Sequence, residues 1–317
     1  MKKIVVAGGG VLGSQIAFQA AYTGNEVTIW LRSQGSIERA KKKLGDLRQT
    51  YLDTIEKMVK KTPNEWANGI AEKDDFDAKE CRKKVELAYE NLRFELDLAK
   101  AVKKADLVIE SVPEVKTDKL KFYKMLAPLL DEKTILVTNS STMLPSTFAK
   151  YTGRPEKYLS MHFANRIWRT NVAEVMSQPE TSEQAFSAVV KIAKAMKMVP
   201  LPIRNEKSGY LLNSMLVPLL LNGLDLYVNG ISDPKSIDAA WTIGTGAPRG
   251  PFQIMDIVGL NTVYNVVLQY QKVPSPMKPL LKKMMMPYNF KGMKKVLEEY
   301  IEAGKLGVST GEGFYKY

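Results

Sequence analysis

The chain has 317 residues, 45% of them hydrophobic and 25% charged, and a formal net charge of +12. This length exceeds the size at which one hydrophobic core usually divides, so we expect a globular protein of two domains. The single cysteine, Cys81, excludes an intrachain disulfide and favours a reducing compartment, while the longest apolar run, Met215–Leu221, is too short to span a bilayer. The composition predicts a cytoplasmic protein without membrane segments.

The positive charge is spread over short lysine clusters instead of one basic stripe. These clusters are Lys41–Lys43, Lys60–Lys61, Lys282–Lys283 and Lys294–Lys295. Basic segments interleaved with aromatic residues, and the known nucleic-acid-binding motifs, do not accompany them. The pattern favours solvated helix faces, with a phosphorylated small molecule as the second interpretation, and we expect no nucleic-acid partner.

The N-terminus contains a dinucleotide-binding motif in its required setting. A β-branched strand over residues 3–7 leads directly into Gly8-Gly9-Gly10-Val11-Leu12-Gly13, and an alanine-rich helix is predicted over residues 14–23. Gly8 permits the tight turn, Gly10 lets a pyrophosphate approach the backbone, and Gly13 lets the helix pack on the strand. The start of the helix, with Val11 and Leu12, would face the phosphates with free N–H groups.

The end of the second predicted strand, over residues 26–31, bears on which cofactor is bound. In NAD-binding units of this kind, an acidic residue here normally binds the adenosine ribose. This chain instead has Leu31, Arg32 and Ser33. Leu31 cannot accept a hydrogen bond from ribose, whereas Arg32 and Ser33 are suited to a 2′-phosphate, so the sequence favours NADP over NAD. The alternative is that Arg32 stacks on adenine or faces water.

Residues 36–104 are polar, charged and helical in pattern, and predict a helical excursion before the sheet resumes. Further strands are predicted over residues 105–110, 134–138, 158–161, 172–176 and 198–203. Pro113 and Glu114 follow the first of these, and Asn139 with Ser141 follows the second. Ligands bind at the carboxyl edge of open α/β sheets, so these residues are site candidates. The alternatives are a solvated loop acid at Glu114 and helix capping by Ser141.

His162, the only histidine, ends the predicted strand over residues 158–161, and Glu174 lies inside the strand over residues 172–176. Two strands ending at a common edge would bring the carboxylate against the imidazole and build a general acid–base pair. The alternative is a core histidine satisfied by the backbone. After residue 203 the pattern becomes helical, so we predict a Rossmann-type doubly wound α/β domain over 1–203 and an all-helical domain over 204–317.

The chain resembles the L-3-hydroxyacyl-CoA dehydrogenase family along nearly its whole length. The motifs that carry the resemblance are Gly8–Gly13, Ala105–Glu114, Asn139–Ser141, Met161–Phe163, Glu174–Val175, Gly209–Asn213, Gly250–Phe252 and Gly311–Tyr315. The resemblance implies a nicotinamide-binding domain followed by a helical domain that forms a homodimer, with a small-molecule substrate and no metal.

The resemblance also implies roles for individual residues. Ser141, His162, Glu174 and Asn213 fall on the catalytic positions, and Glu114 and Lys119 fall where the family contacts the nicotinamide-ribose side of the cofactor. His162 would remove the hydroxyl proton while hydride moves between nicotinamide and the same carbon. Glu174 would hold the imidazole, and Ser141 and Asn213 would bind the substrate oxygens.

One segment departs from the family pattern. The family usually has proline after His-Phe-x-Asn, but here Arg166 follows Asn165, and Trp168 and Arg169 come next. Two arginines beside the histidine would suit a free carboxylate. The alternative to an acyl-CoA substrate is therefore a free hydroxy acid, as in relatives of the gulonate dehydrogenase, lambda-crystallin and carnitine dehydrogenase type. A non-catalytic dinucleotide-binding protein is the third hypothesis.

Overall fold

The protein is described by a computed structural model that covers residues 1–271 and 288–317. The predicted lysine cluster at Lys282 and Lys283 lies outside these residues. The chain forms two compact units, Met1–Leu211 and Leu212–Tyr317.

The first unit is built on one eight-stranded sheet. Its strands are β1 (Lys3–Ala7), β2 (Glu26–Trp30), β3 (Arg93–Glu95), β4 (Leu107–Glu110), β5 (Ile135–Thr138), β6 (Tyr158–Phe163), β7 (Val172–Met176) and β8 (Val199–Ile203). They are arranged in the order β3-β2-β1-β4-β5-β6-β7-β8, and every neighbouring pair is parallel except β6 and β7. The chain leaves β1 on one side and returns to β4 on the other. The carboxyl ends of these two strands therefore form a topological switch point, where ligands bind in such sheets.

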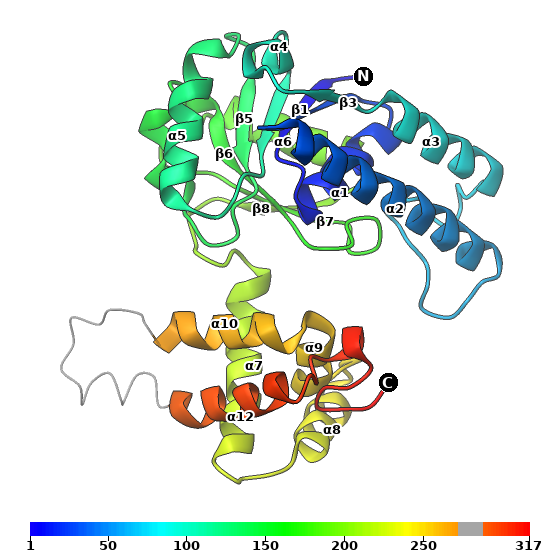
Figure 1. Ribbon diagram of the computed structural model, residues 1–317, viewed down its shortest axis with the longest axis vertical. Helices are drawn as coiled ribbons and strands as arrows, with labels where there is room; N and C mark the ends of the chain where they lie inside the picture. Colours follow the sequence, from blue (N-terminus) through cyan, green and yellow to red (C-terminus); the bar gives the residue numbers. More distant parts are fainter. Residues whose placement is uncertain (272–287) are drawn as a thin grey trace. The chain divides into compact units, whose positions relative to one another are not determined.

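Helices cover both faces of the sheet (Figure 1). One face carries α1 (Val11–Tyr22), α2 (Gln34–Val59), α3 (Ala78–Asn91) and α6 (Glu183–Ala195), and the other carries α4 (Leu98–Val102) and α5 (Lys116–Leu126). Short 3-10 helices are η1 (Ala127–Leu129), η2 (Pro145–Thr147), η3 (Ala149–Tyr151) and η4 (Pro155–Lys157). Strand residues alternate between the two cores, with Ile4 and Val6 on one face and Val5 and Ala7 on the other. The predicted doubly wound α/β fold is confirmed.

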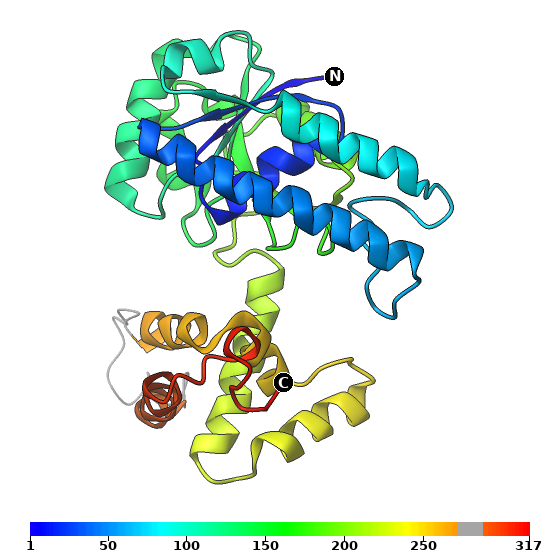
Figure 2. The same cartoon turned by 45° about the vertical axis from the view of Figure 1, so that its right-hand side comes forward.

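The helical excursion consists mainly of α2 and α3, which lie side by side (Figure 2). Buried residues of α2 recur at helical spacing, as at Ala40, Leu44, Leu47 and Tyr51. The opposite face is charged, and Arg82 of α3 pairs with Glu56 of α2 at 2.7 Å. Lys41 and Lys42 of the α2 lysine cluster lie on the exposed face of the helix, as expected.

The second unit is helical, as predicted. It contains α7 (Leu212–Val228), α8 (Pro234–Thr245), α9 (Pro251–Val258), α10 (Leu260–Gln271), α12 (Phe290–Glu302) and the 3-10 helix η5 (Val308–Thr310). Two buried aspartates of this unit accept hydrogen bonds from backbone N–H groups of other segments. Asp238 accepts hydrogen bonds from the backbone N–H groups of Phe252 and Gln253 at the start of α9, and Asp256 accepts them from Phe314 and Tyr315. The C-terminal segment is thereby fixed to α9.

Candidate active site

The glycine-rich turn after β1 fits a dinucleotide pyrophosphate. Gly8 has φ +125°, and a Cβ there would lie 2.2 Å from the carbonyl oxygen of Ser111, while a Cβ at Gly13 would lie 2.3 Å from that of Gly8. Both positions therefore require glycine. Gly10 is the N-cap of α1, no side chain caps this helix, and a Cβ at Gly10 would enter open space. A phosphate can approach here and receive the N–H groups of the first turn.

Val11 and Leu12 form that first turn, the former exposed and the latter partly buried. At the end of β2, Leu31 is buried, with its side chain beside Gly9, so no acceptor for ribose hydroxyls is present at this position. Arg32 and Ser33 are exposed. A hollow of about 310 Å³ connects the turn, the end of β2 and the segment after β4, which includes Pro113.

The α2 residues Ser36, Arg39 and Lys43 also line this hollow, and the sequence reasoning missed them. The signal for them was present in the helical spacing. Positions 36, 39 and 43 fall on one face of a helix that begins directly after the predicted ribose-binding position.

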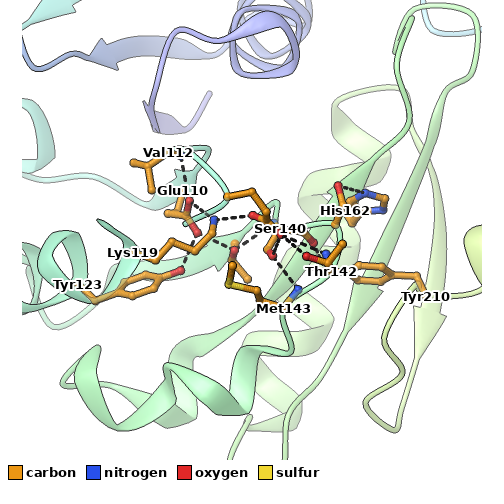
Figure 3. Close-up of polar contacts among 12 residues, drawn as sticks. Glu110, Val112, Lys119, Tyr123, Ser140, Thr142, Met143, His162 and Tyr210 are labelled. Carbon is orange, nitrogen blue, oxygen red and sulfur yellow. Dashed lines mark hydrogen bonds and ion pairs between the residues drawn. The ribbon is translucent and has the colours of Figure 1, made fainter. Parts of the chain in front are cut away.

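A buried charged network lies beside the switch point (Figure 3). The fully buried Glu110 carboxylate accepts hydrogen bonds of 2.7 Å from each of three side chains, Lys119, Tyr123 and Thr138. Burial and the Glu110 charge raise the pKa of the Tyr123 hydroxyl well above its usual range, so this hydroxyl remains a donor. Glu110 was missed by the sequence reasoning, although an acid inside an otherwise apolar strand was a usable signal.

Lys119 connects this network to Glu114. The ammonium of Lys119 lies 3.1 Å from the Glu114 carboxylate, which also receives hydrogen bonds from Ser140 Oγ and from the backbone and hydroxyl of Thr142. Burial acts to raise the pKa of Glu114, but the Lys119 charge and these hydrogen bonds outweigh it and hold the pKa below its ordinary value. Glu114 and Lys119 are thus placed at the carboxyl edge, as the sequence predicted for Glu114.

The loop after β5 is anchored to β6 by Asn139, whose Oδ1 accepts the backbone N–H of Phe163 at 3.1 Å. The next residues carry the hydroxyls of Ser140 and Ser141. Because Ser140 is bonded to Glu114, the loop is fixed on the side of the switch point as well. Ser141 is left to point its hydroxyl at the imidazole of His162.

His162 and Glu174 lie beside each other on the neighbouring strands β6 and β7. The predicted contact between the carboxylate and the imidazole is present. Strands β6 and β7 are antiparallel and place the two residues directly opposite each other, so the two strands do not end at a common edge as expected. His162 Nδ1 lies 2.9 Å from Glu174 Oε2, and Nε2 lies 3.1 Å from Ser141 Oγ. Both members of the pair are buried. A carboxylate at Nδ1 orients the ring and favours positive charge on it, leaving Nε2 for proton transfer.

Tyr210 adds a third contact that the sequence reasoning did not identify. Its ring stacks on the imidazole of His162 with centroids 4.4 Å apart and planes inclined by 10° (Figure 3). The buried Tyr210 hydroxyl donates to the carbonyl oxygen of Ser140 at 2.6 Å, and the next residue, Leu211, donates its N–H to Glu174 Oε1 at 2.9 Å. Asn213 lies in α7 of the second unit, and its catalytic role stays a prediction.

Two of the three residues of the predicted anion site at Arg166, Trp168 and Arg169 are engaged within the protein. The Arg169 guanidinium pairs with Glu65 at 3.0 Å, and Trp168 is buried and packs on Tyr51 with ring centroids 5.3 Å apart. Arg166 is exposed, and its backbone N–H is bonded to Gln15. Trp168 and Arg169 therefore attach this loop to the helical excursion, because the excursion supplies an acidic and an aromatic partner that no local pattern predicts.

Comparison with known proteins identifies the family. The family model described as the 3-hydroxyacyl-CoA dehydrogenase NAD binding domain matches residues 3–206, and that of the C-terminal domain matches residues 209–317. The chain belongs to the 3-hydroxyacyl-CoA dehydrogenase family. It is thus an oxidoreductase that acts on CH–OH donors with a nicotinamide cofactor, as the resemblance implied.

Individual relatives match the chain over nearly its whole length. Human mitochondrial hydroxyacyl-coenzyme A dehydrogenase is 29% identical over 100% of this chain and 91% of its own length. The 3-hydroxybutyryl-CoA dehydrogenase of Clostridioides difficile is 29% identical over 99% of both. Among solved structures, a diketoreductase described for substrate-directed dual catalysis of dicarbonyl compounds is 42% identical, with a TM-score of 0.83, over 100% of this chain and 99% of its own.

Two further findings concern the described parts of the chain. In residues 1–271 and 288–317, no three His, Cys, Asp or Glu side chains gather in a way that would hold a metal ion. Among the same residues, no helix combines the length and the apolar composition that crossing a membrane requires.

Proposed function

We propose that the protein interconverts 3-hydroxyacyl-CoA and 3-ketoacyl-CoA thioesters, with His162 as the acid–base residue. The observation that carries the proposal is the row Glu174–His162–Ser141, in which one ring nitrogen is fixed by a buried carboxylate and the other faces a hydroxyl. When bound, the nicotinamide ring supplies or accepts the hydride. The residues of the chain have to move one proton and hold one oxygen.

In the oxidation direction, Nε2 of His162 takes the proton of the substrate hydroxyl as its C–H hydride leaves. Glu174 stabilises the imidazolium that results, and Ser141 donates to the same substrate oxygen as it becomes a carbonyl. In the reduction direction, the imidazolium returns its proton to the oxygen that gains the negative charge. One alcohol and one oxidised cofactor thus give one ketone, one reduced cofactor and one proton.

We also propose NADP as the cofactor. Leu31 replaces the acid that binds ribose hydroxyls in NAD-dependent units, and Arg32 and Ser33 follow it. We assign Glu114, at the adjacent carboxyl edge, to the nicotinamide-ribose side of the cofactor, and the fully buried Lys119 supports it through their ion pair.

A second candidate substrate class is a dicarbonyl or hydroxy acid without CoA. The 42% identity to a diketoreductase over the whole chain favours it. Of the two loop arginines, Arg169 is engaged with Glu65, and the exposed Arg166 is the one that can still favour a free carboxylate.

Parallel assays of NADPH oxidation with acetoacetyl-CoA and with free acetoacetate separate the two substrate classes. We expect turnover of the thioester, with kcat/KM at least about tenfold above that of the free acid, since remote CoA contacts add binding energy. Equal or higher kcat/KM for the free acid would instead assign the protein to the dicarbonyl class.

For the assembly, we propose a cytoplasmic homodimer formed through the helical unit. Within this unit Met215, Ile231 and Ile243 are at least 68% exposed, and a largely apolar hollow of about 570 Å³ is lined by Leu219, Trp241 and their neighbours. The free, buried Cys81 agrees with a reducing compartment. Sedimentation of a monomer at micromolar concentration would contradict the dimer, and recovery of the native protein outside the cytoplasmic fraction would contradict the location.

A further inference from the structure

The hollow beside the glycine-rich turn is strongly positive. Of its lining residues, Arg32, Arg39 and Lys43 are cationic, and none is acidic. Within the described parts of the chain, none of these three cations forms an ion pair with a carboxylate. Uncompensated cations gathered in one concave site favour an anionic ligand.

Helix α2 holds two of these cations in place. Arg39 Nη2 donates to Ser36 Oγ at 2.9 Å, and Ser36 Oγ lies 3.0 Å from Ser33 Oγ. One turn later, Lys43 Nζ donates to the carbonyl oxygen of Gly9 at 3.2 Å. Ser36, Arg39 and Lys43 therefore line the hollow beside the glycine-rich turn, along one side of the helix.

The first turn of α2 lies beside the same hollow, which Arg32 and Ser36 line. Ser33 is its N-cap, and the Ser33 side chain makes no capping hydrogen bond to the helix backbone. The first-turn N–H groups and the positive end of a 26-residue helix add to the charge of Arg39 and Lys43. Two hydroxyls, a guanidinium fork and an ammonium together match a dianionic phosphate, which presents acceptors only.

We propose that α2 forms the binding site for the phosphate on the adenosine ribose of the cofactor, through Ser36, Arg39 and Lys43. Arg39 forms the bidentate contact, and Lys43 lies between this phosphate and the glycine-rich turn. Leu31 occupies the position of the ribose-binding acid. The residues that distinguish NADP from NAD therefore lie on helix α2 in this proposal. This inference rests on the proposed use of NADP.

A ribose phosphate can come from two sources, because NADP carries it at the 2′ position and coenzyme A at the 3′ position. Calorimetric titration of the full-length protein with 2′,5′-ADP, 3′,5′-ADP and 5′-AMP separates them. We expect 2′,5′-ADP to bind at least about tenfold more tightly than the other two, in line with one or two charge-assisted hydrogen bonds.

Variants locate the site. Arg39→Ala and Lys43→Ala are each expected to remove most of the preference for 2′,5′-ADP, and Arg39→Ala should leave 5′-AMP affinity within about twofold. Lys42→Ala is the matched control, because Lys42 is the exposed neighbour of Lys43 and does not line the hollow. It should retain the preference, which shows that local contact and not net charge is responsible.

Equal affinity for 2′,5′-ADP and 5′-AMP would overturn the proposal, and so would equal losses in the Lys42 and Lys43 variants. Tightest binding of 3′,5′-ADP would assign the phosphate site to coenzyme A and also overturn it. None of these titrations requires turnover. A failure of the dehydrogenase assignment, seen as lack of activity with normal 2′,5′-ADP binding, is therefore distinguishable from a failure of the α2 site.

Discussion

At the scale of single residues, the imidazole of His162 is held on three sides. Glu174 fixes Nδ1, Ser141 faces Nε2, and the Tyr210 ring covers one face of the ring at 4.4 Å. Tyr210 touches neither end of the proton path, so we regard it as a positioning residue. An aromatic face beside imidazolium also stabilises the charged form by cation–π attraction.

Replacing Tyr210 separates its ring from its hydroxyl. Tyr210→Leu removes the stack and should lower kcat about tenfold, the kinetic equivalent of an aromatic pair worth about 1.4 kcal/mol, with little change in the KM of the cofactor. Tyr210→Phe keeps the stack and loses the hydroxyl with its hydrogen bond to Ser140, so it should restore most of kcat. Steady-state kinetics of the three proteins make this comparison.

The same variants have a spectroscopic control. His162 is the only histidine, so its ring protons give single NMR resonances, shifted by the ring current of the stacked tyrosine. We expect the shift to persist in Tyr210→Phe and to vanish in Tyr210→Leu. A leucine variant with full kcat and an unchanged resonance would refute the positioning role.

At the scale of elements, strand β4 and helix α5 are joined by a buried ion pair. Lys119 and Glu110 lie 2.7 Å apart, with side chains 1% and 0% exposed. The pair Lys133–Asp106 has the same separation, but its side chains are 54% and 24% exposed. The two ion pairs have the same N–O distance but differ in burial. Comparing them therefore tests how much burial adds to the contribution of an ion pair to stability.

Lys119→Met should lower the free energy of unfolding by about 3–5 kcal/mol, because Glu110 is left buried without its cation. Lys133→Met should cost less than about 1 kcal/mol, since water and salt screen that pair. Urea denaturation measures both differences. Equal losses in the two variants would mean that the Lys119–Glu110 pair contributes no more than a surface contact.

At the scale of the whole molecule, local rules account for what the sequence predicts well. The glycines at positions 8 and 13 are recognisable because no other residue fits their turn, and the strands of the sheet are recognisable by their apolar runs. His162 is identified by its chemistry, as a single histidine at the end of a strand. The fold and the centre of the candidate site can therefore be predicted from short segments of the sequence.

Contacts between distant segments account for what the sequence does not predict. The predicted contact between His162 and Glu174 is made by an antiparallel pair of neighbouring strands, and no residue pattern records that direction of β7. Arg169 pairs with Glu65, which is 104 positions away in the sequence, so a predicted substrate arginine has a partner within the protein that no local pattern indicates. Arg39 and Lys43 read as ordinary helix charges until α2 is placed beside the glycine-rich turn.

The most direct test of the account compares wild-type protein with His162→Gln in NADPH oxidation by acetoacetyl-CoA. Glutamine keeps a polar side chain in the site but cannot pass a proton, so kcat should fall by about 10²–10⁴. The affinity for NADPH, followed by its fluorescence, should stay within about twofold, which separates a chemical defect from a folding defect. Full turnover by His162→Gln would contradict the acid–base assignment on which the account depends.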